Sequence, residues 1–412
     1  MTKEKGIPQI RFSGFTDTWE QRKLGEVVKE VTRNDSTSEA PIMMITANNG
    51  FIEQSERYAF NNAGESLKKY ILLEKGELAY NHGASKLRPY GSCFALTTAE
   101  NARIPFVYHC FSVENQNAEF MSIELNSSEI ENQLRKIVSS GARMDGLLNI
   151  SFDEYSSVSV VLPSIEEQDR IAGFLRNLDR LITLHQRKYD KLTKVKKAML
   201  EKMFPKNGSL YPEIRFKGFT DAWEQRKLGE ISESFEYGLN AAATEYDGKH
   251  KYIRITDIDD STHLFLQDDL TSPDIDFSTA DDYLLQEGDV LFARTGASVG
   301  KTYIYRRSDG DLYFAGFLIR AKIKSDYDAD FVFQNTLTDS YDSYIRITSQ
   351  RSGQPGVNAQ EYANFALSVP SLAEQKKIGA YFSHLDSLIT LHQRKLEKLK
   401  NIKKACLEKM FV

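Results

Sequence analysis

Two loops of similar composition carry the residues most able to do chemistry. Residues 76–86 read GELAYNHGASK, and residues 288–301 read GDVLFARTGASVGK. Each loop leaves a β-like run through small residues, which let a bulky partner approach closely, and ends in a lysine. Basic and amide side chains placed there can reach phosphates or base edges. We therefore predict nucleic-acid contacts from Asn81, His82, Ser85, Lys86 and Arg88 in the first loop and from Arg294, Thr295, Ser298 and Lys301 in the second. A plain hairpin with solvated charges is the alternative.

The second loop also contains GASVGKT at residues 296–302, which is close to a nucleotide-binding P-loop. A P-loop needs G-x-x-x-x-G-K-[ST], but its first glycine position is occupied here by Thr295. A P-loop must also run into a helix, whose amides hold the phosphate, whereas residues 303–323 read as strand and turn. The sequence therefore argues against nucleotide binding at this loop.

A second pair of loops has a related composition: residues 139–149 read SSGARMDGLLN and residues 349–358 read SQRSGQPGVN. Arginine can make two hydrogen bonds to guanine, and glutamine can make two to adenine. We predict Arg143, Arg351 and Gln354 as further DNA-contacting residues, with ordinary turn residues as the open alternative.

Signatures of catalysis are missing from the sequence. There is no Asn-Pro-Pro-aromatic motif, no glycine-rich methyl-donor motif, no helicase motif and no Ser/His/Asp order. Cys93, Cys110 and Cys406 follow no zinc or redox spacing, so neither a metal nor a disulfide is predicted. We expect a chain without catalytic residues, metal or cofactor of its own.

Length and composition allow two or more domains with cores of their own. The chain has 412 residues, of which 41% are hydrophobic and 27% charged. It has no apolar run of about 18 residues and starts with the polar stretch MTKEKGIPQI. We therefore expect a cytoplasmic protein with no membrane partner.

The formal net charge of −5 argues against a generic nucleic-acid binder, which uses a basic surface to displace counterions. The distribution is uneven: residues 232–368 carry 12 basic and 23 acidic residues, whereas residues 162–204 carry 10 basic and 6 acidic ones. Any DNA contact within 232–368 must therefore be local and selective.

The elements that must position these loops are duplicated. Residues 162–204 recur at 369–411, an offset of 207, with 25 of 43 residues identical. Residues 7–27, IPQIRFSGFTDTWEQRKLGEV, recur at 211–231 with 16 of 21 identical. The protein is therefore a tandem duplication, in which variable segments 28–161 and 232–368 alternate with repeated ones.

Each repeated 43-residue segment predicts one long helix. It opens with proline, then Ser164 or Ser371, then a Glu-Gln pair, as capped helices do. About 38 helical residues would span roughly 55–60 Å. Apolar residues recur at heptad spacing, which favours a coiled coil between the two helices. The expected seam is Ile171, Leu178, Leu192 and Met199 with Phe174, Leu181 and Val195, facing Ile378, Leu385, Leu399 and Cys406 with Tyr381, Leu388 and Ile402.

Two polar and two aromatic positions stand out in the repeats. His185 and His392 interrupt the seam, and in a symmetric antiparallel pair they would lie near the pseudo-two-fold axis. We interpret them as register-fixing residues rather than as metal ligands or catalytic groups. The only tryptophans, Trp19 and Trp223, occupy equivalent places. We interpret them as packing anchors, with base stacking as the alternative.

The variable segments contain short β-like runs, such as 40–46, 251–255, 290–293 and 313–323, together with helical stretches at 126–139 and 328–340. We predict two pseudo-symmetric α+β domains separated by two long antiparallel coiled-coil helices. The expected limits are residues 1–161 and 205–368 for the domains with their anchors and linker, and 162–204 and 369–412 for the helices. A compact second domain returns the chain to where it entered, so the second helix should run back along the first. The C-terminal end should then lie near the first anchor.

The repeated order of three motifs resembles the specificity subunit of Type I restriction-modification systems. These motifs are the W-E-Q-R-K-L-G-E anchors, the G-D-V-L-F-A-R-T-G-A-S-V-G-K type of loop and the P-S-x-x-E-Q helices. The resemblance implies two target-recognition domains that each read one half of a split sequence in double-stranded DNA, with the helices as a ruler. The first-half loop is one residue shorter than the second and lacks a counterpart of Gly300.

The resemblance also implies partners. Two modification subunits would dock on the repeats, bind S-adenosylmethionine and methylate adenine, and two motor-nuclease restriction subunits would use ATP and magnesium. This chain itself would be non-catalytic. Two alternatives stay open: a coiled-coil protein-protein scaffold without DNA specificity, and an enzyme that acts alone.

Overall fold

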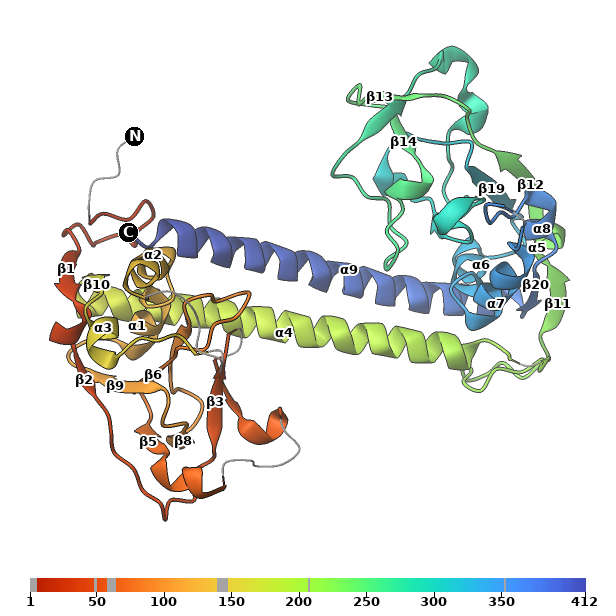
Figure 1. The fold of residues 1–412 in the computed structure, drawn as a ribbon. Helices are drawn as coiled ribbons and strands as arrows, with labels where there is room; N and C mark the ends of the chain where they lie inside the picture. The colour runs from red at the N-terminus through yellow and green to blue at the C-terminus, as the bar shows by residue number, and fades with distance from the viewer. Residues whose placement is uncertain (1–5, 48–49, 58–63, 139–146, 207, 352) are drawn as a thin grey trace. The chain divides into compact units, whose positions relative to one another are not determined.

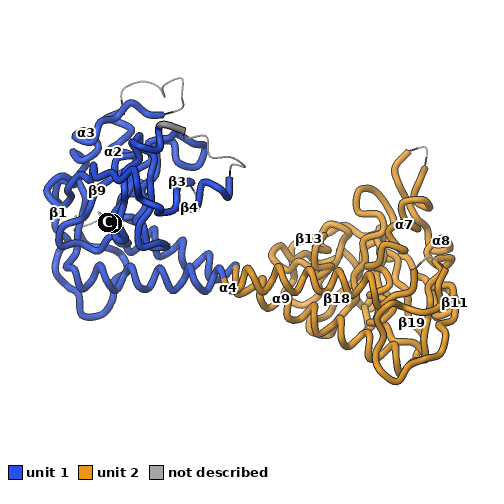
Figure 2. The backbone as a smooth tube through the Cα atoms, turned by 90° about the horizontal axis from the view of Figure 1, so that it is seen from below, with its two compact units in different colours: residues 1–183, 397–412 blue, residues 184–396 orange. Residues whose placement is uncertain are grey.

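The computed structural model describes residues 6–47, 50–57, 64–138, 147–206, 208–351 and 353–412. The chain divides into two compact units, one made of residues 1–183 and 397–412 and the other of residues 184–396 (Figure 2). Each unit therefore contains one variable segment and part of both long helices.

Unit 1 is built on a four-stranded antiparallel sheet accompanied by short helices (Figure 1). Its strands stand in the order β2 (Val28–Glu30), β9 (His109–Val113), β6 (Leu78–Asn81) and β7 (Ser92–Ala95). Three antiparallel pairs flank it: β1 (Glu20–Lys23) with β10 (Ser159–Leu162), β3 (Met43–Thr46) with β4 (Gly50–Glu53), and β5 (Ile71–Glu74) with β8 (Asn101–Ile104). The helices are α1 (Ala118–Glu124), α2 (Ser128–Ile137) and α3 (Phe152–Ser156).

Unit 2 repeats this plan with its own strands. The sheet order is β12 (Ser232–Tyr237), β19 (Leu318–Ile323), β16 (Val290–Ala293) and β17 (Thr302–Ile304). Two antiparallel pairs, β11 (Glu224–Lys227) with β20 (Ala366–Val369) and β13 (Ala243–Glu245) with β15 (Thr271–Pro273), accompany the parallel pair β14 (Lys251–Ile253) with β18 (Leu312–Phe314). The helices are α5 (Leu228–Ile231), α6 (Ala329–Asn335), α7 (Asp339–Thr348) and α8 (Ala359–Ala363). The predicted α+β class is confirmed in both units.

The long helices are confirmed as α4 (Ile165–Met203) and α9 (Leu372–Lys409). The hydroxyl of Ser164 caps the first of them, because the amide of Glu167 donates to Ser164 Oγ at 3.4 Å. The Glu-Gln pair has another use. Its glutamate binds the anchor through two hydrogen bonds of 2.7 Å, from Arg11 to Glu167 in unit 1. Arg215 binds Glu374 in the same way, also at 2.7 Å, in unit 2.

The glutamine of the same motif binds the N-terminus of a short helix in each unit. The amide of Asn117, the N-cap of α1, donates to Gln168 Oε1 at 3.0 Å, and the amide of Asp328, the N-cap of α6, donates to Gln375 Oε1 at 3.0 Å. The repeated residues therefore join anchor, variable segment and long helix at one point in each unit.

The two helices run antiparallel within each unit. In unit 1, Lys403 Nζ lies 2.5 Å from Asp179 Oδ1, and in unit 2, Lys196 Nζ lies 2.6 Å from Asp386 Oδ1. The Nδ1 atoms of His185 and His392 are 2.8 Å apart, as the symmetric antiparallel interpretation predicts. Such a contact requires one nitrogen to donate and the other to accept, so the pair discriminates against other registers.

Two positions of the predicted seam were wrong, because Leu181 and Ile402 are 41% and 36% exposed. On α9, Phe382, Ile389 and Leu396 are buried in addition to the predicted Ile378 and Leu385. Heptad spacing allows either the third or the fourth residue after Ile171 or Ile378 to complete the seam. The fourth residues, Leu175 and Phe382, are buried because they also pack into the cores of their units.

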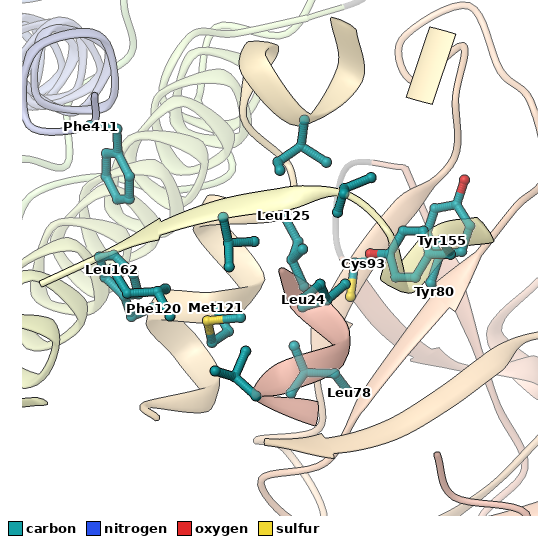
Figure 3. Packing of buried hydrophobic residues seen from close by; sticks show 14 of the residues in the cluster. Leu24, Leu78, Tyr80, Cys93, Phe120, Met121, Leu125, Tyr155, Leu162 and Phe411 are labelled. Carbon is teal, nitrogen blue, oxygen red and sulfur yellow. The ribbon is translucent and has the colours of Figure 1, made fainter. Parts of the chain in front are cut away.

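Both tryptophans are anchors, as predicted: Trp19 is 3% exposed and Trp223 is 1% exposed, which excludes base stacking by either ring. Each contacts the phenylalanine that ends a long repeat. Phe411 packs edge-on against Trp19. It also stacks on Phe120, and both phenylalanines belong to the buried cluster in Figure 3. Phe204 does the same with Trp223 and Phe331.

The C-terminal end lies beside the first anchor, as expected, because the amide of Ile10 donates to the carbonyl of Lys409 at 2.9 Å. The amide of Ile214 donates equivalently to Lys202 at 2.8 Å. Some element limits were wrong in detail. The predicted strand 313–323 is two strands separated by a turn at residues 315–317, and the predicted helix 328–340 is α6 followed by the start of α7. In both cases a short turn interrupts an element that the hydrophobic pattern alone predicts to be continuous.

Candidate nucleic-acid interface

Unit 2 brings its two predicted loops together. An isolated antiparallel bridge joins Thr295 to Gly356. The amide of Gly296 donates to the carbonyl of Pro355 at 3.0 Å, and the amide of Val357 donates to the carbonyl of Arg294 at 2.9 Å. Residues 294–301 and 353–358, which are about 50 positions apart in sequence, therefore form one surface.

Arg294 lies on this surface in a form suited to recognition. Its guanidinium carbon is 4.9 Å from the ring centroid of Tyr237, which is itself 44% exposed. Among the described residues no carboxylate pairs with Arg294, so the stack supports the planar group and leaves its N–H donors free. A supported guanidinium with free donors is the arrangement that bidentate contact with guanine requires.

Gln354 is exposed beside the same loop. Gly296 has a φ of +69°, and a Cβ added to it would lie 2.8 Å from Gln354 Nε2. Glycine at 296 thus serves both the left-handed turn and the close approach of the amide side chain. The pairing places the predicted base readers Arg294 and Gln354 on adjacent loops.

Lys301 and Ser298 face a surface pocket of about 660 Å³. Lys301 Nζ lies 2.5 Å from Asp260 Oδ1 and donates to the carbonyl of Ile258 at 2.9 Å. His263 lines the same pocket, and burial lowers its pKa, with the nearby Lys196 and Lys301 adding to that effect. Lys301 therefore already has partners within the fold.

Arg351 is also engaged. Its Nη2 lies 2.5 and 2.6 Å from the two carboxylate oxygens of Glu361, and its Nη1 donates to the carbonyls of Thr348 and Gln350. It closes the C-terminal end of α7 and ties that helix to α8. Base contact by Arg351 would require this ion pair to open, so the base-reading role of Arg351 stays a prediction.

Unit 1 joins its two loops in the equivalent way. An antiparallel bridge connects Gly83 with Leu147, and the amide of Leu148 donates to the carbonyl of His82 at 2.9 Å. Arg143 belongs to residues 139–146, which lie outside the described part of the chain. The structure therefore places the two backbone segments together and leaves the position of Arg143 a prediction.

The side chains of the first loop have unequal freedom. His82 is 6% exposed, and its ring nitrogens lie 2.8 Å from the carbonyl of Leu148 and 2.6 Å from that of Val107. Asn81 donates to the carbonyl of Ile45, and Arg88 donates to the carbonyl of Asn126.

Ser85 accepts from the amide of Arg88, while Lys86 is exposed and pairs with no described carboxylate. Lys86 is thus the member of this loop best placed to reach a phosphate.

Sequence reasoning missed Tyr237, which supports Arg294 from β12. The two residues are 57 positions apart, and no motif or periodicity links them. The only available signal was the general one that arginine stacks on exposed aromatic rings.

Within the described residues, no group of three His, Cys, Asp or Glu side chains is placed to hold a metal ion. No described helix is long and apolar enough to cross a membrane.

Known proteins resemble this chain in sequence and in fold. The model for the Type I restriction modification DNA specificity domain matches residues 16–194 and again residues 220–401. The Type I restriction enzyme MjaVIII specificity subunit of Methanocaldococcus jannaschii is 24% identical over 302 residues, 69% of this chain and 67% of that protein. The putative type I restriction enzyme MjaX specificity subunit of the same organism is 26% identical over 214 residues, about half of each protein at 49%.

The crystal structure of the S subunit of a Type I restriction-modification system from M. genitalium superimposes with a TM-score of 0.58 at 15% identity. That alignment covers 98% of this chain and 99% of the other. Its likeness shows a shared fold. Two matched copies of the specificity domain, the duplicated anchors and the paired long helices show that this chain belongs to the family of Type I restriction-modification DNA specificity subunits.

Proposed function

We propose that each unit reads one half of a split sequence in double-stranded DNA, and that the paired helices set the distance between the halves. The observation that carries this proposal is the joining of two variable loops at equivalent positions of both units, Gly83 with Leu147 and Thr295 with Gly356. A repeated frame that presents dissimilar loops suits a protein that must recognise two different half-sites.

The readers lie within residues 1–161 and 205–368. In unit 2, Arg294 and Gln354 contact base edges, while Thr295 and Ser298 contact the sugar-phosphate backbone. In unit 1, Lys86 contacts phosphate. The acidic composition of residues 232–368 supports recognition through a few placed donors rather than through a broad basic surface.

The chain supplies specificity and leaves chemistry to other subunits. Two modification subunits dock on the repeated regions, bind S-adenosylmethionine and methylate adenine, and two motor-nuclease subunits use ATP and magnesium. The assembly is then a site-specific deoxyribonuclease and an adenine-specific DNA methyltransferase. Membership of the specificity-subunit family supports this division of labour.

Selection from a pool of randomised DNA tests the proposal. The full-length chain, co-purified with the modification subunits of its own system, should enrich a sequence of two short fixed parts separated by unread positions. The coiled-coil scaffold alternative predicts that no sequence is enriched, and an enzyme acting alone would show ATP hydrolysis, cleavage or methyl transfer without partners.

The ruler role has a separate test. Inserting one heptad at matched positions of α4 and α9 keeps the seam in phase and lengthens both helices. We expect the same two half-sites at a changed spacing. A change in the bases that are read, with spacing unchanged, would contradict the ruler.

A further inference from the structure

We infer that Phe317 and Phe106 are aromatic wedges, one in each unit, that pack against a nucleobase of the corresponding half-site. This inference rests on the proposed DNA-reading function and extends it to residues outside the predicted contact set. Among the phenylalanines that the structure describes, these two are the most exposed, at 59% for Phe317 and 48% for Phe106.

The two residues lie in corresponding β-turns of the repeated fold, Phe106 as the second residue of turn 105–108 and Phe317 as the third residue of turn 315–318. Phe317 precedes β19, in the turn that connects it to β18, and Phe106 lies in the turn between β8 and β9. Strand β19 pairs with β16 and β9 pairs with β6, so both turns stand at the same end of equivalent strand pairs. A single exposed apolar residue needs no explanation, but exposed phenylalanines at equivalent turns of two dissimilar segments do.

Both turns adjoin the loops assigned to DNA contact. The amide of Arg294 donates to the carbonyl of Phe317 at 3.0 Å. In unit 1, the ring of His82 lies 2.6 Å, through Nε2, from the carbonyl of Val107, the neighbour of Phe106. Each phenylalanine is thereby held next to the first residue after strand β6 or β16, where the contact loop begins.

The turn that bears Phe317 is rigid. The amide of Leu318 donates to the carbonyl of Ala315 at 2.8 Å, which closes a β-turn, and the amide of Gly316 donates to the carbonyl of Leu239 at 2.7 Å. A Cβ on Gly238 would lie 2.3 Å from the carbonyl oxygen of Ala315, so the turn is packed tightly onto the end of β12. The equivalent turn in unit 1 is closed by the amide of Tyr108, which donates to Pro105 at 3.0 Å. An aromatic ring on a fixed turn loses little conformational freedom when it binds.

Cations accompany both rings. Arg294 lies over Tyr237 beside Phe317, and Lys69 Nζ is 5.9 Å from the ring centroid of Phe106. A ring with a neighbouring cation fits a ligand that presents flat apolar faces along an anionic backbone, which is the chemistry of DNA. A docked protein fits less well, because one phenylalanine contributes roughly 150–250 Å² whereas a stable interface needs about 800 Å² from each partner.

Three variants test the inference: Phe317→Ala, Phe317→Trp and Phe106→Ala. Each is made in the full-length chain and co-purified with its modification subunits, and its affinity is measured for the DNA that the wild-type protein selects. Alanine removes a base contact worth about 1–3 kcal/mol, so we expect Phe317→Ala to weaken specific binding by roughly 5- to 150-fold. The tryptophan variant should keep affinity. Leu266→Ala, which truncates an apolar residue 43% exposed in the same unit, is the matched control and should bind as wild type.

The fluorescent base 2-aminopurine, placed at successive half-site positions, locates each wedge. We expect one position in the second half-site whose fluorescence change disappears in Phe317→Ala, and another in the first half-site that depends on Phe106. Wild-type affinity and fluorescence in both alanine variants would overturn the inference, as would equal losses at both half-sites or loss of the modification subunits alone. A wild-type complex that selects no sequence would instead overturn the proposed function itself.

Discussion

The two units share a frame in which equivalent residues make equivalent contacts. Arg11 with Glu167 in unit 1 matches Arg215 with Glu374 in unit 2, atom for atom and at the same 2.7 Å. The final phenylalanine of each long repeat closes on the tryptophan of its own unit. Identity in sequence is therefore concentrated where the units must hold their parts together.

The units differ where the frame presents its loops. In unit 1 the residue after β6 is His82, whose ring is buried between two carbonyls. In unit 2 the residue after β16 is Arg294, which stacks on a partly exposed tyrosine. The lysine that ends the loop is exposed as Lys86 in unit 1 and paired with Asp260 as Lys301 in unit 2. The comparison shows that the loop residues differ between the units while the repeated contacts that support the loops stay the same.

The largest expected effect comes from breaking the frame. Glu167→Ala leaves Arg11 without its carboxylate at a site where the glutamate side chain is 1% exposed, and Glu374→Ala does the same to Arg215. Each should cost about 3–5 kcal/mol, because a buried charge loses its partner. Urea unfolding followed by tryptophan fluorescence resolves the units in chains that keep only one tryptophan, since Trp19 reports on unit 1 and Trp223 on unit 2.

Arg176→Ala is the control, because that arginine is 67% exposed in its pair with Glu119 and should cost less than about 1 kcal/mol. If either glutamate variant lowered the free energy of unfolding of both units equally, the contact would not act within its own unit alone.

The pH dependence of stability should also differ between the two units. Glu124 ends α1 in the core of unit 1, and burial raises its pKa to about 7, whereas the equivalent last residue of α6 is Asn335. A carboxyl whose folded pKa exceeds its unfolded value of 4.5 binds more protons when folded, so the stability of unit 1 should fall as pH rises through about 4.5–7. Glu124→Gln should remove this dependence and gain up to about 3 kcal/mol above pH 7. The unfolding midpoint of unit 1 across this pH range measures it, and an unchanged slope would count against a charged Glu124 as the cause.

Recognition should be separable by half-site. Arg294→Ala removes a supported guanidinium and should weaken discrimination at the second half-site by about 1–3 kcal/mol while leaving the first intact. Arg351→Ala should have a smaller effect on reading, because Arg351 already pairs with Glu361. Competition binding with single-base substitutions in each half-site compares the two. A larger loss from Arg351→Ala would show that its ion pair opens on DNA.

The smallest effect is expected at the helix pair. Burial lowers the pKa of both His185 and His392, and the lysines Lys188 and Lys395 lower it further. Because the folded pKa lies below the unfolded value of 6.5, this contribution to the stability of unit 2 is complete above pH 6.5 and is lost as pH falls. The paired change His185→Asn and His392→Asn should flatten that acid-side loss, which is opposite in sign to the Glu124 effect in unit 1. Unfolding of unit 2 between pH 5 and 7.5 would detect it.

Repetition made much of the fold predictable. The cap at Ser164, the two long helices, the contact between His185 and His392 and the burial of the tryptophans all followed from duplicated segments, where each feature was visible twice. The seam was predicted less well because spacing alone allowed either Leu181 or the next residue, Ile182, to be the seam residue. Packing against the core, which has no sequence signature, decided between them.

The candidate site was less predictable. Sequence identified the loops that the structure joins, but it could not show that His82 is buried, that Lys301 and Arg351 are already paired, or that Tyr237 supports Arg294. Those facts depend on residues that are distant in the chain and differ between the units. Loop composition indicates what a side chain can contact, whereas the fold decides which side chains remain free to do so.

A chain with two copies of one reader tests the central claim most directly. Replacing residues 232–368 with a second copy of residues 28–161 keeps both anchors and both long helices. Selection from randomised DNA should then yield the first half-site twice, in inverted orientation, because equivalent frames would present identical loops. Recovery of the original second half-site would contradict the assignment of one reader to each unit.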